Sequence, residues 1–312
     1  MLKISVVIPS YNRRELLLEC LASVAQQSYK PHEVIVVDDG STDGTIEVLQ
    51  ERGDLHLIVQ ENAGPGAARN TGAKHASGDY IAFLDSDDVW FPWSLETMAK
   101  MVERDSPTLV FGAYEDFDAA VPALEKSEAA DAKFLDYLAS ADHGYFAGAG
   151  MILVDRDVFS AVGGFIEDRL NAEDHDLALK LGVSRGFVKV LSPVTVAHRV
   201  HQGNAMGDAI ANWDGVRRLI SREQNGVYDG GVERRMARRK IICGHARSAT
   251  ISLAQSGKFA TSIGAFFRTF IWNIRLGRVK FVLSFPALLG YYVVKALLGG
   301  SGFSKTAAQS IG

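Results

Sequence analysis

The stretch YIAFLDSDD, residues 80–88, decides the fold prediction because an apolar run ends abruptly in three carboxylates. Residues 80–84 have the length and composition of a buried strand. In an open α/β sheet, ligand-binding groups follow the carboxyl ends of the strands. Carboxylates there suit Mg²⁺ or Mn²⁺, and such a cation can hold two phosphates of a nucleotide. The alternative is a simple turn, because Asp and Ser are also common turn residues.

Outward from this stretch, strand and helix patterns alternate over the first 90 residues. Strands are predicted at 4–8, 33–37, 55–59 and 80–84, and helices at 15–28, from about 45 onward and around 67–73. This alternation predicts a Rossmann-like, mainly parallel sheet flanked by helices. Polar or acidic groups follow three of the strands, and parallel strands bring their carboxyl ends to one edge. We therefore expect a single nucleotide-sized site at that edge.

Three side chains near this edge suit a nucleotide. Asp39 could accept hydrogen bonds from a pyrimidine, Tyr11 could stack on the base, and Arg69 could approach base or phosphate. Each has a plainer interpretation. Asp39 could cap its turn, Tyr11 could be a half-buried aromatic of the loop, and Arg69 could be a solvated helix charge.

Four ordered motifs carry a family resemblance: VVIPSYN at 6–12, VVDDGSTD at 36–43, AARNTG at 67–72 and FLDSDD at 83–88. Together they resemble the family-two nucleotide-sugar glycosyltransferases of GT-A fold, of the bacterial polysaccharide-biosynthesis type. The resemblance covers roughly residues 1–205. It implies an inverting, metal-dependent transferase that moves a sugar from a nucleoside diphosphate donor, with a UDP-sugar expected, to a glycan or lipid-linked acceptor.

The resemblance also implies residue roles. Asp174 matches the catalytic base, Asp85 a ribose or metal-shell position, and Asp87 the main metal ligand, a role that Asp88 could share. The remaining positions that match nucleoside-binding residues are Pro9, Tyr11, Asp39 and Arg69.

The residues around Asp174 support that assignment only in part. Glu173 and Asp174 precede Leu177, Leu179 and Leu181, so they are predicted in the first turn of a helix, where the helix dipole stabilises a carboxylate. Single displacement needs such a group to accept the proton of the acceptor hydroxyl. Helix capping is the alternative.

Two further segments fit the same chemistry. A predicted strand at 195–198 leads into residues 199–204, which resemble a loop that closes over the diphosphate in related enzymes. His201 could complete the metal shell and Arg199 could neutralise phosphate charge, although a lone His is more often a packing residue. The small residues at 146–150 indicate an acceptor-side loop or a simple turn.

The charge distribution separates the C-terminal part from the rest. Of the 33 Lys and Arg residues, 13 follow Glu233, whereas none of the 37 Asp and Glu residues does. Residues 263–274 place apolar side chains at helical spacing. Residues 281–294 carry no charge, but Pro286 and Gly290 interrupt this stretch, which is shorter than the roughly 20 apolar residues of a full membrane span. We expect a basic, amphipathic tail that lies on the membrane rather than on a nucleic acid. An amphipathic helix packed on the soluble part is the alternative.

These patterns predict three parts: a catalytic domain at 1–205, a helical linker at 206–257 and a membrane-associating tail at 258–312. The N-terminus has no secretory signal pattern and the two cysteines have no metal or redox spacing. We therefore expect free thiols and a cytoplasmic protein that is peripheral to the inner face of the cell membrane.

Two other functions remain open at this point. A sugar-phosphate nucleotidyltransferase also uses a parallel sheet and metal-binding acids, but it usually has a Gly-rich phosphate loop after the first strand, and residues 9–12 lack it. Arg13 and Arg14 keep this possibility open. The third option is a non-catalytic scaffold that binds nucleotide-sugar at the membrane.

Overall fold

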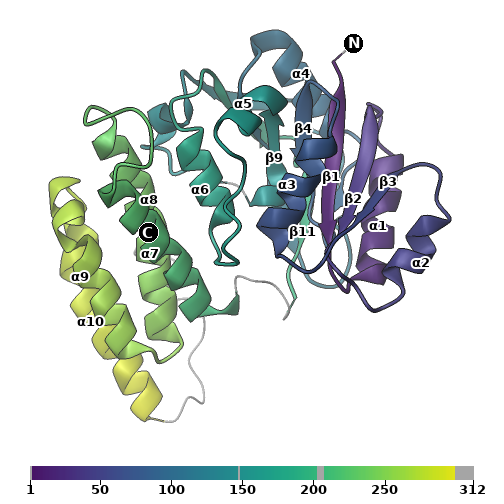
Figure 1. Cartoon of the computed structure of the whole chain (residues 1–312). Coiled ribbons are helices and arrows are strands. Elements are labelled where there is room, and N and C mark those ends of the chain that lie inside the picture. The colour runs from purple at the N-terminus through teal and green to yellow at the C-terminus, as the bar shows by residue number, and fades with distance from the viewer. Residues whose placement is uncertain (1, 147, 202–206, 299–312) are drawn as a thin grey trace.

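The computed structural model describes residues 2–146, 148–201 and 207–298. An α/β part, which ends near residue 199, lies beside a layer of four C-terminal helices (Figure 1). The remaining residues, among them 202–204 of the predicted diphosphate loop and 299–312 of the predicted tail, lie outside the described part of the chain.

The main sheet has eight strands in the order β3-β2-β1-β4-β9-β6-β10-β8. Strands β9 and β8 run antiparallel to their neighbours, and the others share one direction. The predicted mainly parallel sheet is therefore confirmed, with two reversed strands that the sequence did not reveal. The strands are β1 (Ile4–Ser10), β2 (Glu33–Asp38), β3 (His56–Val59), β4 (Tyr80–Phe83), β6 (Leu109–Phe111), β8 (Ala130–Phe134), β9 (Ile152–Asp155) and β10 (Phe187–Ser192).

A second, three-stranded sheet has the order β5-β11-β7, with β5 (Val89–Trp90), β7 (Tyr114–Phe117) and β11 (Val196–Arg199). Strand β5 follows the acidic motif directly and pairs with β11. This pairing brings the segment around residue 199 next to Asp87 and Asp88, more than one hundred residues away in the sequence.

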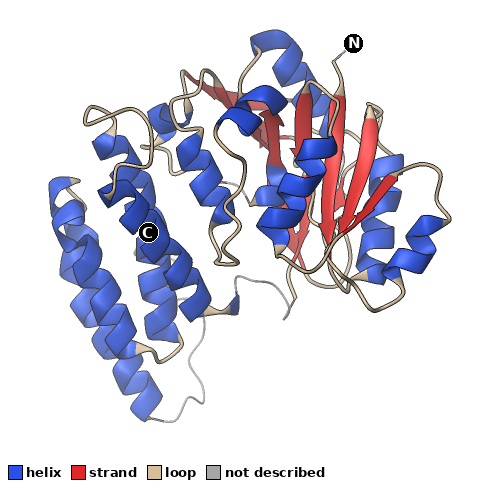
Figure 2. Ribbon diagram, in the orientation of Figure 1, coloured by secondary structure: helices blue, strands red, loops and turns tan. Residues whose placement is uncertain are grey.

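Helices flank the main sheet on both faces (Figure 2). Helix α3 begins with a proline, whose fixed φ suits the first helical turn. A Cβ on Gly72 would lie 2.4 Å from the Val7 side chain, so only glycine allows α3 to lie this close to β1. The helices are α1 (Arg14–Ala25), α2 (Thr45–Gln50), α3 (Pro65–His75), α4 (Ser94–Asp105), α5 (Arg156–Ala161) and α6 (Glu173–Lys180), with 3-10 turns η1 (Tyr137–Ser140) and η2 (Ala149–Met151).

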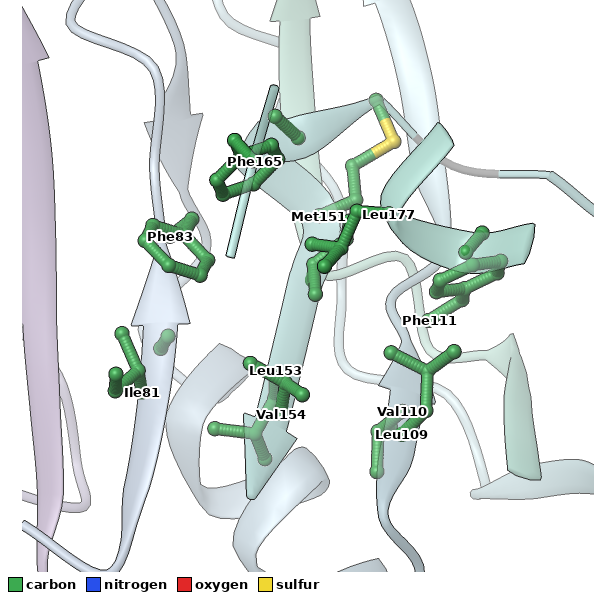
Figure 3. Packing of buried hydrophobic residues seen from close by; sticks show 14 of the residues in the cluster. Ile81, Phe83, Leu109, Val110, Phe111, Met151, Leu153, Val154, Phe165 and Leu177 are labelled. Carbon is green, nitrogen blue, oxygen red and sulfur yellow. The ribbon is translucent and has the colours of Figure 1, made fainter. Parts of the chain in front are cut away.

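The core beneath the acidic motif is buried and apolar, with phenylalanine rings among aliphatic side chains (Figure 3). The rings of Phe83 and Phe165 meet edge to face with centroids 5.0 Å apart. Leu177 of α6 has no exposed surface and lies beside Met151 in the same cluster (Figure 3). Burying a leucine side chain stabilises by about 1.5–3 kcal/mol, so this contact fixes the start of α6 over the sheet edge.

The C-terminal layer consists of α7 (Ala209–Gln224), α8 (Arg235–Gln255), α9 (Phe259–Arg275) and α10 (Val279–Leu297). Helix α8 packs against both α7 and α9. The predicted division at residue 257 therefore falls between two helices that pack on each other, and the division at 205 falls outside the described residues.

Helix α10 continues through Pro286 and Gly290, the two residues that interrupt the apolar stretch in the sequence. Pro286 lacks one backbone hydrogen bond, but Phe281, Val282 and Phe285 are buried in a cluster with Phe266 of α9, and this packing holds the helix together. In the described part of the chain, α10 is the helix that is long and apolar enough to cross a bilayer by length and composition, with 17% of that window buried.

Candidate active site

An open cleft of about 2500 Å³ runs along the carboxyl edge of the main sheet and on to helices α8 and α10. Nine of the ten site residues expected from the sequence line this cleft; Arg199 is the exception. The nine are Pro9, Tyr11, Asp39, Arg69, Asp85, Asp87, Asp88, Asp174 and His201.

Arg69 connects three elements at the centre of the cleft. Its guanidinium lies 2.6 Å from the Asp85 carboxylate after β4 and 2.9 Å from the Glu173 carboxylate at the start of α6. Arg69 is only 5% exposed, so it is not a solvated helix charge. Burial alone would raise the pKa of Asp85, but the Arg69 charge holds that pKa below its usual value. Arg69 thus keeps Asp85 ionised.

Asp174 lies in the first turn of α6, as predicted. Its carboxylate accepts a hydrogen bond from the N–H of His175, the next residue, and the N-cap position belongs to Ala172. It therefore does not act as the N-cap. Burial raises the pKa of Asp174 to about 6. A carboxylate with this pKa is ionised at neutral pH and is a stronger base than an exposed aspartate.

The acidic motif carries more negative charge than its neighbours neutralise. Asp87 lies 2.6 Å from Arg13 and 3.0 Å from His201, and Asp88 accepts the N–H of Arg199 at 3.0 Å. Burial and the nearby charges of Asp85 and Asp87 raise the pKa of Asp88. A cation bound at this point would relieve that repulsion.

The side chains at the acidic motif can be compared with the ligands that a divalent metal prefers. Within residues 2–146, 148–201 and 207–298, no group of three or more His, Cys, Asp or Glu side chains is arranged to hold one. Carboxylate oxygens and a neighbouring imidazole nonetheless suit Mn²⁺ or Mg²⁺. The residues therefore fit such an ion, and Asp87 also pairs with Arg13 at 2.6 Å and lies 3.0 Å from the His201 ring.

Asp39 and Tyr11 line another part of the cleft. Asp39 accepts hydrogen bonds from the Gln60 side chain at 2.7 Å and from the N–H groups of Ala63 and Gly64 at 2.9 and 2.8 Å. It thus fixes the loop between β3 and α3. Tyr11 is 48% exposed over the cleft, so its ring has an open face on which a base can stack.

Arg199 lies behind the acidic motif and does not line the cleft. Its guanidinium pairs with Glu19 of α1 at 2.5 Å and donates to the Asp87 carbonyl at 3.0 Å. It also lies 4.6 Å above the Phe117 ring. In this arrangement Arg199 positions the acidic loop, and its direct contact with phosphate stays a prediction.

The loop before β9 approaches the acidic motif closely. A Cβ on Gly150 would lie 2.9 Å from the backbone nitrogen of Asp85, so a glycine is required there. Gly148 and Ala149 line the cleft, while residue 147 lies outside the described part of the chain. The small residues noted in the sequence thus let the loop approach Asp85, and a role toward an acceptor stays a prediction.

Three contacts at the site were not foreseen. Arg13 pairs with Asp87, Glu19 pairs with Arg199, and the rings of His175 and His245 stack with centroids 3.7 Å apart. A basic residue after the first strand could have suggested Arg13. Nothing in the sequence could have paired His175 with His245, because they come from separate helices, α6 and α8. The two cysteines are free and buried, as expected.

Comparison with known proteins gives matches over both the α/β part and the whole chain. The family model Glycosyl transferase family 2 matches residues 5–163. Glycosyltransferase GlyA of Streptococcus pneumoniae serotype 4 is 42% identical over 121 residues, which is 37% of this chain and 17% of that protein. The Escherichia coli protein WfgD, a UDP-Glc:alpha-D-GlcNAc-diphosphoundecaprenol beta-1,3-glucosyltransferase, is 39% identical over 115 residues, 36% of this chain and 46% of that protein. The uncharacterized glycosyltransferase RP339 of Rickettsia prowazekii is 26% identical over 297 residues, 87% of this chain and 89% of that protein.

Coverage differs among these relatives. The matched segment spans 17%, 22% and 18% of the length of the first three, GlyA and two uncharacterized Rickettsia glycosyltransferases. The match to RP339, in contrast, extends over most of both chains.

Solved structures share the fold. The Staphylococcus aureus TarS fragment 1–349 in complex with UDP-GlcNAc superposes with a TM-score of 0.64 at 23% identity, over 78% of this chain and 72% of that one. The mannosyltransferase PcManGT from Pyrobaculum calidifontis, in complex with GDP-Man and Mn²⁺, gives 0.55 at 19% identity, over 96% and 88%. The expected α/β, GT-A-like architecture with C-terminal helices is thereby confirmed.

The family match begins in β1, includes all four motifs and ends just after α5. It covers just over half of the chain. Since the sequence motifs, the cleft residues and the fold agree with it, the chain belongs to Glycosyl transferase family 2, a family of nucleotide-sugar glycosyltransferases (EC 2.4).

Proposed function

We propose that this protein is an inverting glycosyltransferase that moves a sugar from a UDP-sugar to a hydroxyl of a glycan or lipid-linked acceptor. The observation that carries the proposal is Asp174, a carboxylate whose pKa is raised to about 6, in the same cleft as the acidic motif and Tyr11. The names of two related proteins support a UDP donor: WfgD uses UDP-Glc, and TarS was solved with UDP-GlcNAc.

The proposed reaction is one displacement at the anomeric carbon. The acceptor oxygen forms a bond to that carbon while the bond to the diphosphate oxygen breaks, and the nucleoside diphosphate leaves with the electron pair. Asp174 takes the hydroxyl proton as the new bond forms. Arg69 fixes the start of α6 through Glu173, so that the base stays aligned with the donor.

Donor binding is assigned to the part of the cleft that Asp39 and Tyr11 line. Tyr11 stacks on the base, Pro9 borders it, and Asp39 holds the adjoining loop in place. Asp85, the first carboxylate of the acidic motif, is held ionised by Arg69 and is assigned to the ribose or the metal shell. Arg13, now on Asp87, is the nearest cation for the leaving diphosphate.

A divalent cation is part of this proposal. Mn²⁺ or Mg²⁺, when bound, would act as a Lewis acid on the departing diphosphate. Asp87, Asp88 and His201 would hold it, since they supply the carboxylate and imidazole groups that such ions accept. PcManGT, which shares the fold, was solved with Mn²⁺.

We also propose that the protein works at the inner face of the cell membrane. Helix α9 exposes Phe267 to 64% and Ile271 to 56%, and α10 exposes Leu283 to 73%. No Asp or Glu follows Glu233, so cations alone accompany this apolar surface. An apolar helix face with basic residues around it suits an anionic bilayer surface.

Calorimetry of UDP, GDP and CDP binding to the full chain tests the donor site, first with Mn²⁺ and then with a chelator. Tighter binding of UDP that is lost with the chelator supports a metal-dependent UDP site. If folded protein binds none of the three, the transferase proposal fails and a scaffold role gains support. UDP binding that persists in the chelator would contradict the proposed metal requirement but would still support a UDP-sugar as the donor.

Flotation with vesicles tests the membrane location. The full chain should float with vesicles that contain phosphatidylglycerol and much less with pure phosphatidylcholine vesicles, with the difference reduced by salt. Equal and negligible flotation with both would remove the proposed location.

A further inference from the structure

The wall of the cleft opposite the sheet is basic. Arg247 of α8, Arg278 at the turn before α10 and Lys280 of α10 all line it. Arg278 donates to the Lys240 carbonyl at 2.9 Å. The Arg247 side chain makes no hydrogen bond or ion pair with any residue that the structure describes. These cations therefore lie without a carboxylate partner among the described residues.

The two guanidinium groups lie close enough to affect each other. Burial lowers the pKa of Arg278, and the charge of Arg247 lowers it further. Partly buried like charges without a counter-ion cost free energy, and a bound anion would remove that cost. The arrangement is therefore that of a site for an anion.

This basic group lies on the side of the cleft that faces the proposed base. Asp174 is 3.4 Å from the His175 ring, which stacks on His245 of α8. Burial lowers the pKa of His245, and His175 and the charge of Arg278 lower it further, so Arg278 lies near this stack. Neighbouring side chains thus lead from Asp174 through His175 and His245 to Arg278. This direction leads away from the carboxylates of the acidic motif.

The cleft continues between α8 and α10, where apolar side chains lie beside Ser252, Gln255 and Ser284, and Gln255 donates to the Tyr292 hydroxyl at 2.9 Å. A Cβ on Gly244 of α8 would meet nothing within 4 Å. Across from it, α10 contributes Phe281, Leu288 and Tyr291 to the lining. Cations at one end and apolar side chains along the other match an amphiphile with an anionic head and a hydrocarbon chain.

We propose that Arg247, Arg278 and Lys280 bind the diphosphate of a lipid-linked acceptor, and that the groove between α8 and α10 takes the first part of its hydrocarbon chain. The inference rests on the proposed function and narrows its acceptor to the lipid-linked class. It also explains how the C-terminal layer takes part in catalysis: the diphosphate on Arg247 and Arg278 would place the acceptor sugar beside Asp174.

Binding of farnesyl diphosphate to the full chain tests the proposal, with pyrophosphate and farnesol as its two halves. The measurements are made by calorimetry in a chelator, so that a metal on the acidic motif does not bind the diphosphate. Farnesyl diphosphate should bind at least about tenfold more tightly than either half, since charge and apolar contacts add. Binding no tighter than that of pyrophosphate would overturn the proposal.

Two variants localise the site. Arg247→Gln should weaken farnesyl diphosphate binding about tenfold, and Gly244→Leu should block the groove between α8 and α10, while both keep the UDP affinity of the unaltered chain. Arg268→Gln, which removes a cation of α9 that does not line the cleft, is the matched control and should change nothing. Equal effects of Arg247→Gln and Arg268→Gln would contradict the assignment. If Gly244→Leu does not fold, Arg247→Gln decides alone.

Two further measurements separate this proposal from the proposed membrane binding and from the proposed donor site. Flotation of Arg247→Gln with phosphatidylglycerol vesicles should match that of the unaltered chain; a loss as large as that for farnesyl diphosphate would show that Arg247 binds lipid headgroups and would overturn the inference. UDP binding, measured on the same samples, reports on the donor site. Farnesyl diphosphate binding without UDP binding would therefore contradict the proposed function but support the anion site at Arg247, Arg278 and Lys280.

Discussion

The α/β part and the C-terminal layer differ in how many apolar side chains they leave exposed. All seven residues of β1 are buried, and its apolar side chains belong to the core. Helix α9 buries Phe266 and Trp272 on one face but exposes Phe267 and Ile271 on another. In water alone, exposure of these large apolar side chains is unfavourable. The α/β part thus keeps the apolar side chains of β1 out of water. The C-terminal layer, in contrast, has an exposed apolar surface that suits contact with another apolar surface.

The two regions also differ in charge at the shared cleft. The sheet edge presents Asp85, Asp87, Asp88 and Asp174, whereas the opposite wall presents Arg247 and Arg278. Carboxylates suit a metal-bound donor and a proton acceptor, and guanidinium groups suit a phosphate-bearing acceptor. The difference indicates that each region serves one of the two substrates, and that the chemistry takes place where they meet.

The largest effect is expected from the base on the α/β side. Asp174→Asn should lower the rate of sugar transfer by about 10²- to 10⁴-fold, because the amide cannot accept the hydroxyl proton. UDP affinity should stay unchanged, since Asp174 is assigned to the acceptor hydroxyl and not to the nucleotide. Transfer assays and calorimetry on one preparation check both. Unreduced turnover in purified Asp174→Asn would take the role of base away from this residue.

The second test compares one buried ion pair in each region. Arg69→Leu leaves Asp85 and Glu173 without their partner, whereas Arg238→Leu removes the partner 2.6 Å from Glu223 but leaves Arg239 at 3.4 Å. Arg69→Leu should lower the free energy of unfolding by about 3–5 kcal/mol, because buried charges are left unpaired, and Arg238→Leu should lower it by less. Only Arg69→Leu should also weaken UDP binding. Denaturant unfolding and calorimetry measure the two effects, and loss of UDP affinity in folded Arg238→Leu would contradict the division of labour.

The third test concerns the outer face of α9. Phe267→Ser combined with Ile271→Ser should weaken binding to phosphatidylglycerol vesicles by about 10- to 100-fold, since the exposed portions of the two side chains together contribute roughly 1.5–3 kcal/mol when they leave water. The melting temperature should change little, because both residues are exposed in the folded chain. Val59→Ser is the control: Val59 is 50% exposed, but it lies in β3 of the α/β part. An equal loss of vesicle binding in Val59→Ser would mean that the outer face of α9 is not a specific membrane-binding surface.

The smallest effect concerns stability and pH. The folded pKa of Asp174, about 6, lies above its ordinary value of 3.8, so the folded chain binds this proton more tightly than the unfolded chain. The contribution to stability is therefore complete below pH 4 and is lost as the pH rises to about 6. Asp174→Asn lacks this loss and should be more stable than the unaltered chain by about 1–3 kcal/mol at pH 8. The gain should vanish at pH 3.5, and a gain independent of pH would point to another cause.

The sequence predicted the α/β part well because its signals are local. Four of the strands lie within one or two residues of their predicted positions, and the helix that begins at Glu173 starts where it was expected. The acidic run after residue 84 and the residues at the ends of the strands also identified nine residues of one cleft. Each of these signals is a pattern within a few residues of chain, and a parallel sheet brings such patterns together at one edge.

The C-terminal layer was predicted less completely, since amphipathicity alone does not say which face of a helix meets another helix. Of the apolar residues of α9, Phe266 packs inward, while Ile263 and Phe267 face outward. Pro286 did not end α10, because packing on α9 outweighs the loss of one hydrogen bond.

By itself, then, the sequence determined the family, the strand pattern and the chemical type of the donor edge, because short motifs and periodicity encode them. Only the tertiary structure decided that Arg69 joins Asp85 to Glu173, that His245 stacks on His175, and that Arg247 lines the same cleft. These contacts connect residues far apart in the chain, and their geometry depends on how whole elements pack. For the same reason, burial could raise the pKa of Asp174 only once α6 lay against the folded core.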